Sequence, residues 1–148
     1  MQKLLNCKDI KIKIVMTQEE KDLLLKDLCA RLPYGVKCSH KNENVYSVVS
    51  IDLGKYSYIF ITNNDGFRIG EPEIKNIKPY LFPLSSMTEE QKRELYNLVE
   101  ETAFQILHSE DDNPHFHIAM DWYNKNHFDY RGLIPMGLAN DATGKNIY

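Results

Sequence analysis

Cysteine is scarce in this chain, and the few cysteines have no pairing pattern. The 148 residues contain 3 cysteines, and no two of them form a Cys-x-x-Cys pair. This number and spacing fit neither a disulfide scaffold nor a zinc knuckle, so we expect the reducing environment of a cytoplasm. Cys29 falls on the apolar side of an expected helix and Cys38 on an expected strand. Both are predicted to be buried small apolar side chains.

Long apolar runs and an excess of one charge are also missing. No run approaches the roughly 18 consecutive apolar residues of a membrane-spanning helix, and residues 1–15 lack the apolar stretch of a signal peptide. The 18 basic and 21 acidic residues are mixed along the chain, with a formal net charge of −3 and no basic stripe for a phosphate backbone. The sequence thus predicts no membrane partner and disfavours duplex nucleic acid as the main ligand.

The short motifs that identify common enzyme classes are absent as well. The chain has no Gly-x-Ser-x-Gly turn, no glycine-rich phosphate loop and no His-Glu-x-x-His motif. Asp52 and Asp65 stand in expected hairpin turns, where aspartate is favoured for its local backbone hydrogen bonds. A non-enzymatic protein is therefore favoured, and an enzyme is left open.

Three helices are expected from capping and periodicity. They cover residues 17–32, 88–110 and 116–126. The first begins with a capping box of Thr17 and Glu20, and the second with a capping box of Thr88 and Gln91. All three carry apolar residues at helical spacing, so each is predicted to be amphipathic.

Short β-rich runs separated by turn residues predict a sheet. They occupy residues 36–41, 45–51, 56–62 and 67–69. Connections this short join antiparallel neighbours, because a parallel crossover needs about a dozen residues or more. Prolines in residues 71–87 predict an irregular connector rather than a regular helix or a central strand. We therefore expect an α+β fold: an antiparallel three- to five-stranded meander packed against two longer helices and one short C-terminal helix.

The domain organisation is expected to be simple. No linker divides the chain, so residues 16–139 are predicted to form a single α+β domain. Residues 1–15 are expected to be an N-terminal extension or an edge strand, because isoleucines alternate with lysines over residues 10–14. Residues 140–148 are expected to be a flexible tail.

Residues 115–138 concentrate imidazoles and carboxylates of the types that zinc or iron prefers. The candidate metal ligands are His115, His117, Asp121, His127 and Asp129. His117 and Asp121 would share a face of a helix, whereas His115 and His117 would share a face only in an extended segment. The alternative to a metal site is that these residues surround a docked helix and that the protein has no cofactor.

The same segment and the predicted sheet are rich in aromatic residues, which favour interfaces. The candidate partner-binding residues are Trp122, Tyr123, His127, Tyr130 and Arg131 in the C-terminal segment, with Tyr56 and Tyr58 on a strand. The strand face could bind a protein partner, a second copy of the chain or stacked bases, or a helix could cover it. Arg131 could pair with an anionic group of a partner or with an internal aspartate.

Three blocks of the sequence together resemble an uncharacterised family of small proteins encoded by phages and prophages of gut bacteria. The blocks are residues 26–36, 77–88 and 127–133. The resemblance extends over about residues 16–139 and implies a phage accessory or host-takeover protein that acts in the bacterial cytoplasm. It assigns no activity, substrate or cofactor to any residue.

Our leading hypothesis from the sequence is a non-enzymatic phage or prophage accessory protein that binds a host or phage protein through an aromatic surface. One alternative is a metal-binding domain or metal-dependent enzyme that uses the His/Asp cluster. A second alternative is a small-nucleotide-binding protein that uses the aromatic residues and Arg131.

Overall fold

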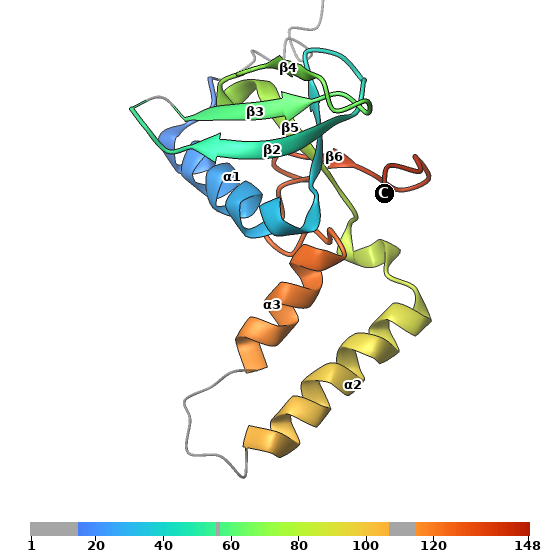
Figure 1. The fold of residues 1–148 in the computed structure, drawn as a ribbon. Coiled ribbons are helices and arrows are strands. Elements are labelled where there is room, and N and C mark those ends of the chain that lie inside the picture. The colour runs from blue at the N-terminus through green and yellow to red at the C-terminus, as the bar shows by residue number, and fades with distance from the viewer. Residues whose placement is uncertain (1–14, 56, 107–114) are drawn as a thin grey trace, which may run out of the picture.

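The computed structural model describes residues 15–55, 57–106 and 115–148, and these form one mixed sheet and three α-helices (Figure 1). The helices are α1 (Gln18–Arg31), α2 (Glu89–Ile106) and α3 (His115–Lys125). The strands are β1 (Lys37–His40), β2 (Tyr46–Asp52), β3 (Tyr58–Thr62), β4 (Arg68–Gly70), β5 (Ile77–Leu81) and β6 (Asn140–Asp141). The expected α+β class is confirmed, and the expected edge strand over residues 10–14 lies outside the described residues.

The sheet has the strand order β4-β3-β2-β1-β5-β6. The first four strands pair as the expected antiparallel meander, and β1 also pairs antiparallel with β5. The last strand, β6, pairs parallel with β5. The described sheet is therefore mixed and has six strands, one more than the largest number expected.

The expected irregular connector contains a central strand, β5, which corrects the prediction from its prolines. Pro79 lies opposite Cys38 of β1, and on the other side β6 pairs only with Tyr80 and Leu81. The missing N–H of Pro79 therefore falls beyond the end of the β5–β6 ladder. A proline is tolerated in a strand where its nitrogen has no ladder partner, as on an edge strand.

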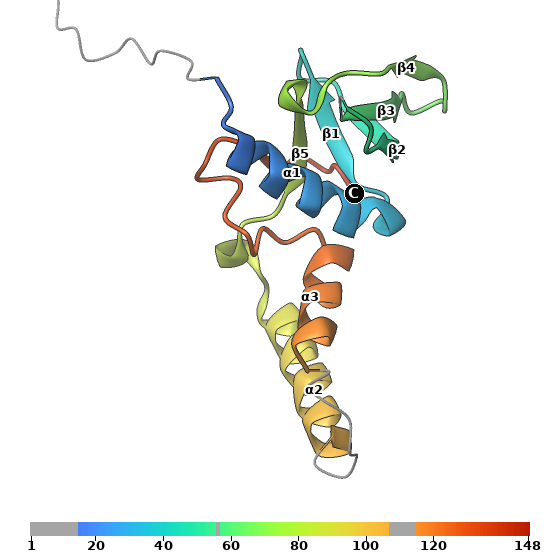
Figure 2. The ribbon, with the colours of Figure 1, turned by 90° about the vertical axis from the view of Figure 1, so that its left-hand side faces the viewer.

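α1 begins as the sequence predicts and covers one face of the sheet (Figure 2). Thr17 Oγ1 accepts a hydrogen bond from the Glu20 N–H at 3.2 Å, and Glu20 Oε2 accepts one from the Thr17 N–H at 2.9 Å. The core between α1 and the sheet is formed by Leu24, Leu28, Val36, Cys38, Val48, Ile59, Ile61, Ile77 and Leu81, among others. Cys29, expected to be buried, is exposed, whereas Cys38 is buried as expected.

The helices α2 and α3 form a hairpin-like arm that extends away from the sheet (Figures 1 and 2). The expectation that two longer helices pack on the sheet thus holds for α1, while α2 lies beside α3. No side chain of α2 among residues 89–101 is buried. Within the described ranges, no helix is long and apolar enough to cross a membrane.

The segment 140–148, expected to be a flexible tail, makes specific contacts with the sheet. The Ala142 N–H donates to the Leu81 carbonyl at 2.8 Å. The Tyr148 hydroxyl donates to the Tyr80 carbonyl at 2.8 Å and accepts from the Lys37 N–H at 3.1 Å. These bonds add the C-terminal residues to the end of the sheet formed by β5 and β6.

Candidate functional site

The aromatic C-terminal segment is positioned by an unusual end to α3. His127 adopts a left-handed conformation with φ of 59°. Its N–H donates to the Asn124 carbonyl at 3.3 Å, and the Phe128 N–H donates to the Tyr123 carbonyl at 3.0 Å. This is a Schellman motif, in which glycine normally occupies the position of His127. The turn directs the chain back onto the body of the protein.

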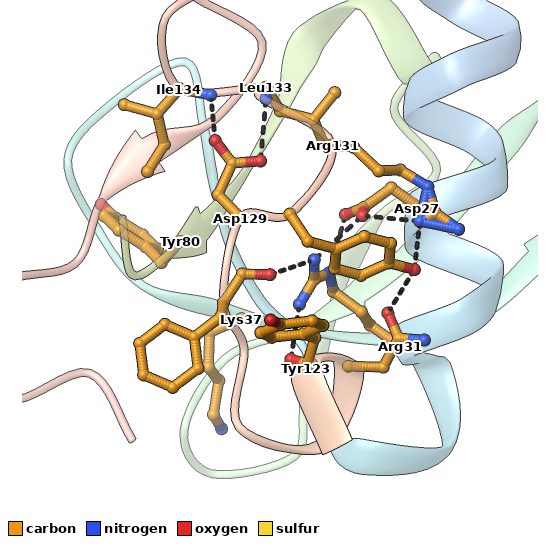
Figure 3. A network of polar contacts seen from close by, with 12 residues as sticks. Asp27, Arg31, Lys37, Tyr80, Tyr123, Asp129, Arg131, Leu133 and Ile134 are labelled. Atoms are coloured by element: carbon orange, nitrogen blue, oxygen red, sulfur yellow. Dashed lines mark hydrogen bonds and ion pairs between the residues drawn. The ribbon is translucent and has the colours of Figure 1, made fainter. Parts of the chain in front are cut away.

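A buried ion pair in α1 holds this turn in place (Figure 3). Arg31 Nε donates to Asp27 Oδ2 at 2.8 Å, and both side chains are 0% exposed. The Arg31 guanidinium also donates to the carbonyls of Phe128 at 2.7 Å and Tyr123 at 3.3 Å. Arg31 therefore neutralises Asp27 and satisfies two carbonyl groups at the C-terminal end of α3.

Arg131 completes this network from the other side. Its guanidinium lies 3.5 Å from Asp27 Oδ1 and 4.5 Å from the centre of the Tyr130 ring, and it donates to the Tyr130 hydroxyl. The Tyr130 hydroxyl donates to Asn124 Oδ1 at 3.1 Å. Of the two roles considered for Arg131, the internal pair with an aspartate is the one present. Asp27 faces two arginines from separate segments.

His127 is buried against the C-terminal tyrosine. The rings of His127 and Tyr148 stack at 3.7 Å and 9° between planes. Burial, together with the positive charge of Arg31, lowers the pKa of His127 from its ordinary value of 6.5 to about 4. His127 Nδ1 has no hydrogen-bond partner among the described atoms. The imidazole is therefore neutral near pH 7 and enclosed by the fold.

The predicted metal ligands are not gathered into one site. Asp129 accepts hydrogen bonds from the N–H groups of Leu133 and Ile134, both at 2.8 Å (Figure 3). His117 and Asp121 are exposed on α3, away from the enclosed His127, and the side chain of His115 lies outside the described part. Over the described ranges, no group of three or more His, Cys, Asp or Glu side chains is arranged to hold a metal ion.

The predicted partner-binding residues of the C-terminal segment are largely enclosed. Trp122 and His127 are 5% and 6% exposed, and the Trp122 ring stacks on Phe128 at 5.6 Å. Tyr123, Tyr130 and Arg131 are partly buried. These side chains join α3 to the sheet layer through internal contacts.

Sequence reasoning missed Asp27 and Arg31, although a charged pair four residues apart among the leucines of an apolar helix face was a visible signal.

The second predicted surface, on the sheet, is partly exposed among the described residues. In β3 the side chains of Ile59 and Ile61 are fully buried, while Tyr58 and Phe60, on the opposite face, are partly exposed. The helix α1 lies on the face with the isoleucines, and no helix among the described residues covers the other face (Figure 2). Side chains of β3 thus alternate between a buried and a partly exposed face, and Tyr56 lies outside the described residues.

Large apolar side chains are exposed around the edge strand β4. Phe67 is 70% exposed and Ile69 is 46% exposed. The Arg68 guanidinium lies 4.5 Å from the centre of the Phe60 ring and pairs with Glu71. We call Phe67 and Ile69 the β4 patch. It combines apolar side chains with one side of a strand that no other described strand pairs with.

A hollow of about 150 Å³ lies between the first turns of α1 and the segments around Lys55 and Ile74. Its lining contains three lysines and two carboxylates, of which Lys75 and Glu73 pair with each other at 3.0 Å.

Comparison of the chain with protein-family models, curated proteins and solved structures gives no match.

Proposed function

We propose that this protein is a non-enzymatic binding module that takes up an extended segment of a partner protein along β4. The observation that carries the proposal is that the outer edge of β4, which pairs with no strand among the described residues, coincides with the exposed β4 patch. An added strand would bond to the N–H and C=O groups of β4 that face away from β3, and its side chains would contact Phe67 and Ile69.

The edge strand β4 and the residue before it carry large apolar side chains that are exposed. An unpaired strand with large apolar side chains is an aggregation risk that proteins normally reduce with charge, proline or a covering segment. β4 has only three residues and carries Arg68, which limits self-pairing but leaves Ile69 46% exposed. Such apolar exposure beside an open edge is typical of a surface that is covered in a complex.

The resemblance to phage and prophage proteins supplies the setting of this proposal. A small accessory protein of a phage acts by binding, so the partner segment would belong to a host or phage protein in the bacterial cytoplasm. The C-terminal segment contributes to the fold rather than to this contact, because its aromatic side chains are engaged internally.

The experiment compares three forms of the full chain as bait in a bacterial host lysate. The wild type is compared with the double variant Phe67→Asp/Ile69→Lys, and Met136→Lys is the control because Met136 is 45% exposed outside the β4 patch. We expect the double variant to lose about tenfold or more of the captured partner, as for central contact residues. The control should capture as much as the wild type.

Hydrogen exchange of the captured complex then locates the contact. Strand addition should protect the N–H groups within residues 68–70 that face away from β3, while those of α3 exchange as in the free protein. Equal capture by the double variant, or a complex in which these N–H groups are not protected, would overturn the proposal.

A further inference from the structure

The arm formed by α2 and α3 leaves the apolar side of α2 incompletely covered. Four residues recur at helical spacing along this side and remain partly exposed beside α3. They are Gln91, Leu95, Leu98 and Val99. A surface helix of a globular protein normally turns its apolar stripe into a core. A two-helix arm has room for a further helix along this side.

Beside the stripe, three exposed residues of α2 lie one turn apart. They are Lys92, Tyr96 and Glu100, and the Tyr96 side chain, 62% exposed, is the large aromatic residue at the centre. The Tyr96 hydroxyl donates to the Glu100 carboxylate, which orients the ring along the helix. The three residues form a row that is positive at one end, aromatic in the middle and negative at the other.

This row is complementary to itself in one orientation only. Lys92 and Glu100 lie at equal distances, about 6 Å along the axis, on either side of Tyr96. Two antiparallel copies related by a two-fold axis at Tyr96 would bring Lys92 of each copy opposite Glu100 of the other. A parallel pair would place like charges opposite each other, which is unfavourable.

We infer that α2 is a dimerisation helix, and that a second copy of this chain docks antiparallel on it through Lys92, Tyr96 and Glu100. The α2–α3 arms of two copies then form a four-helix bundle, in which the partly exposed Leu95 and Val99 become core residues. The strand β4 lies in the sheet, away from α2, so the β4 patch takes no part in this contact (Figure 1). The inference therefore does not depend on the proposed function.

Charge reversal tests the pairing directly, with sedimentation velocity of the full chain over a concentration series. We expect the wild type to form dimers, and Lys92→Glu and Glu100→Lys each to weaken dimerisation by about tenfold or more, because each places like charges opposite at two contacts. An equimolar mixture of the two single variants should form a heterodimer, since both contacts again join opposite charges. The variant Lys92→Glu/Glu100→Lys should dimerise within about threefold of the wild type.

Two controls separate this contact from effects on folding. Glu94→Lys reverses a charge on another side of α2 and should leave dimerisation unchanged. Lys92 also pairs with Glu89 at 2.7 Å within the helix, so the melting temperature of every variant is measured as well. Phe67→Asp/Ile69→Lys should remain dimeric, which separates failure of this inference from failure of the proposed function.

A wild type that is monomeric at all concentrations would overturn the inference. So would a mixture of the single variants that stays monomeric, or a Glu94→Lys variant that is weakened as much as Lys92→Glu. A dimer that survives both charge reversals would place the contact elsewhere on the molecule and would equally reject it.

Discussion

Asp27 and Arg31 form an ion pair that is inaccessible to water, and Arg131 shares the same carboxylate. A buried ion pair is weak evidence for stability, but removal of one partner leaves an uncompensated charge in the interior. Among the described residues, Asp27 is the carboxylate that pairs with both arginines. The negative charge of Asp27 therefore contributes to stability beyond the hydrogen bonds that its oxygens accept, because it offsets the positive charges of both arginines.

We expect Asp27→Asn to lower the free energy of unfolding by about 3–5 kcal/mol, because both guanidinium groups would face each other without a counter-charge. Urea denaturation at neutral pH measures the change. Asp22→Asn, on the exposed side of the same helix, should change the free energy by no more than about 0.5 kcal/mol. Similar effects of the two substitutions would contradict a special role for the buried carboxylate.

His127 makes stability depend on pH in a defined direction. The unfolded chain binds a proton at this residue below about pH 6.5, whereas the folded chain does so only near pH 4. The free energy of unfolding should therefore fall as pH decreases through this window, by at most about 1.4 kcal/mol per pH unit from this group. Above pH 6.5 both states are neutral at this residue and it adds no slope.

Urea midpoints measured between about pH 7 and about pH 5 for wild type and His127→Asn test this dependence. Asparagine tolerates the left-handed conformation but does not titrate, so the variant should be less stable at neutral pH and should show a flatter profile. His117→Asn, at an exposed position, should keep the wild-type slope. An unchanged slope in His127→Asn would assign the pH dependence to other groups.

Residue types alone could not separate structural from functional roles in the C-terminal segment. The sequence drew attention to three residues that have internal partners. His127 stacks on the Tyr148 ring, Asp129 accepts hydrogen bonds from nearby backbone N–H groups, and Arg131 pairs with Asp27 of α1. A metal site, a binding surface and an internal network use the same side chains. Only the three-dimensional arrangement shows that Asp129 is occupied by two N–H groups and that Arg131 lies next to Asp27.

At the scale of elements, the two capping boxes start helices with different surroundings. Thr17 caps α1, which covers the sheet, and Thr88 caps α2, which lies in the arm. The same local hydrogen bond therefore supports the core in one case and a peripheral pair of helices in the other. Local stability can differ widely between such units.

We expect Thr17→Ala to lower the global free energy of unfolding by about 1 kcal/mol, the usual cost of a lost N-cap. Thr88→Ala should instead speed exchange of N–H groups in α2 while those of β2 and β3 exchange at the wild-type rate. Hydrogen exchange with mass spectrometry measures both variants together. Faster exchange throughout the sheet in Thr88→Ala would show that the arm and the core unfold as one unit.

Local signals predicted most elements, whereas long-range pairing produced the differences. Capping boxes located the starts of α1 and α2, and turn residues located β1 to β4 to within about two residues. The sequence did not predict β5, because a proline normally argues against a central strand. Pro79 is tolerated there because β6 pairs only with Tyr80 and Leu81 and leaves the proline nitrogen without a ladder partner. β6 is two residues long, and its pairing partner lies about sixty residues earlier in the chain.

At the scale of the whole molecule, periodicity predicted which helices are amphipathic but not what they pack against. The stripes of α1 and α2 look alike in the sequence, yet α1 covers the sheet and α2 lies beside α3 (Figure 2). What each helix packs against depends on the segment that connects it to the sheet. Only residues 82–88 separate the end of β5 from the start of α2. Such geometry is a property of the assembled fold.

The position of Tyr148 has a consequence for how the protein is made. Its hydroxyl joins the Lys37 N–H of β1 to the Tyr80 carbonyl of β5. This link between the two strands cannot form until Tyr148, 111 positions after Lys37, has been synthesised. On a translating ribosome, β1 and β5 can pair while this residue is still unsynthesised, but His127 then lacks the ring that encloses it. The nascent chain therefore carries an uncovered imidazole until Tyr148 has been synthesised and has docked, and the link between Lys37 and Tyr80 through this hydroxyl forms only then.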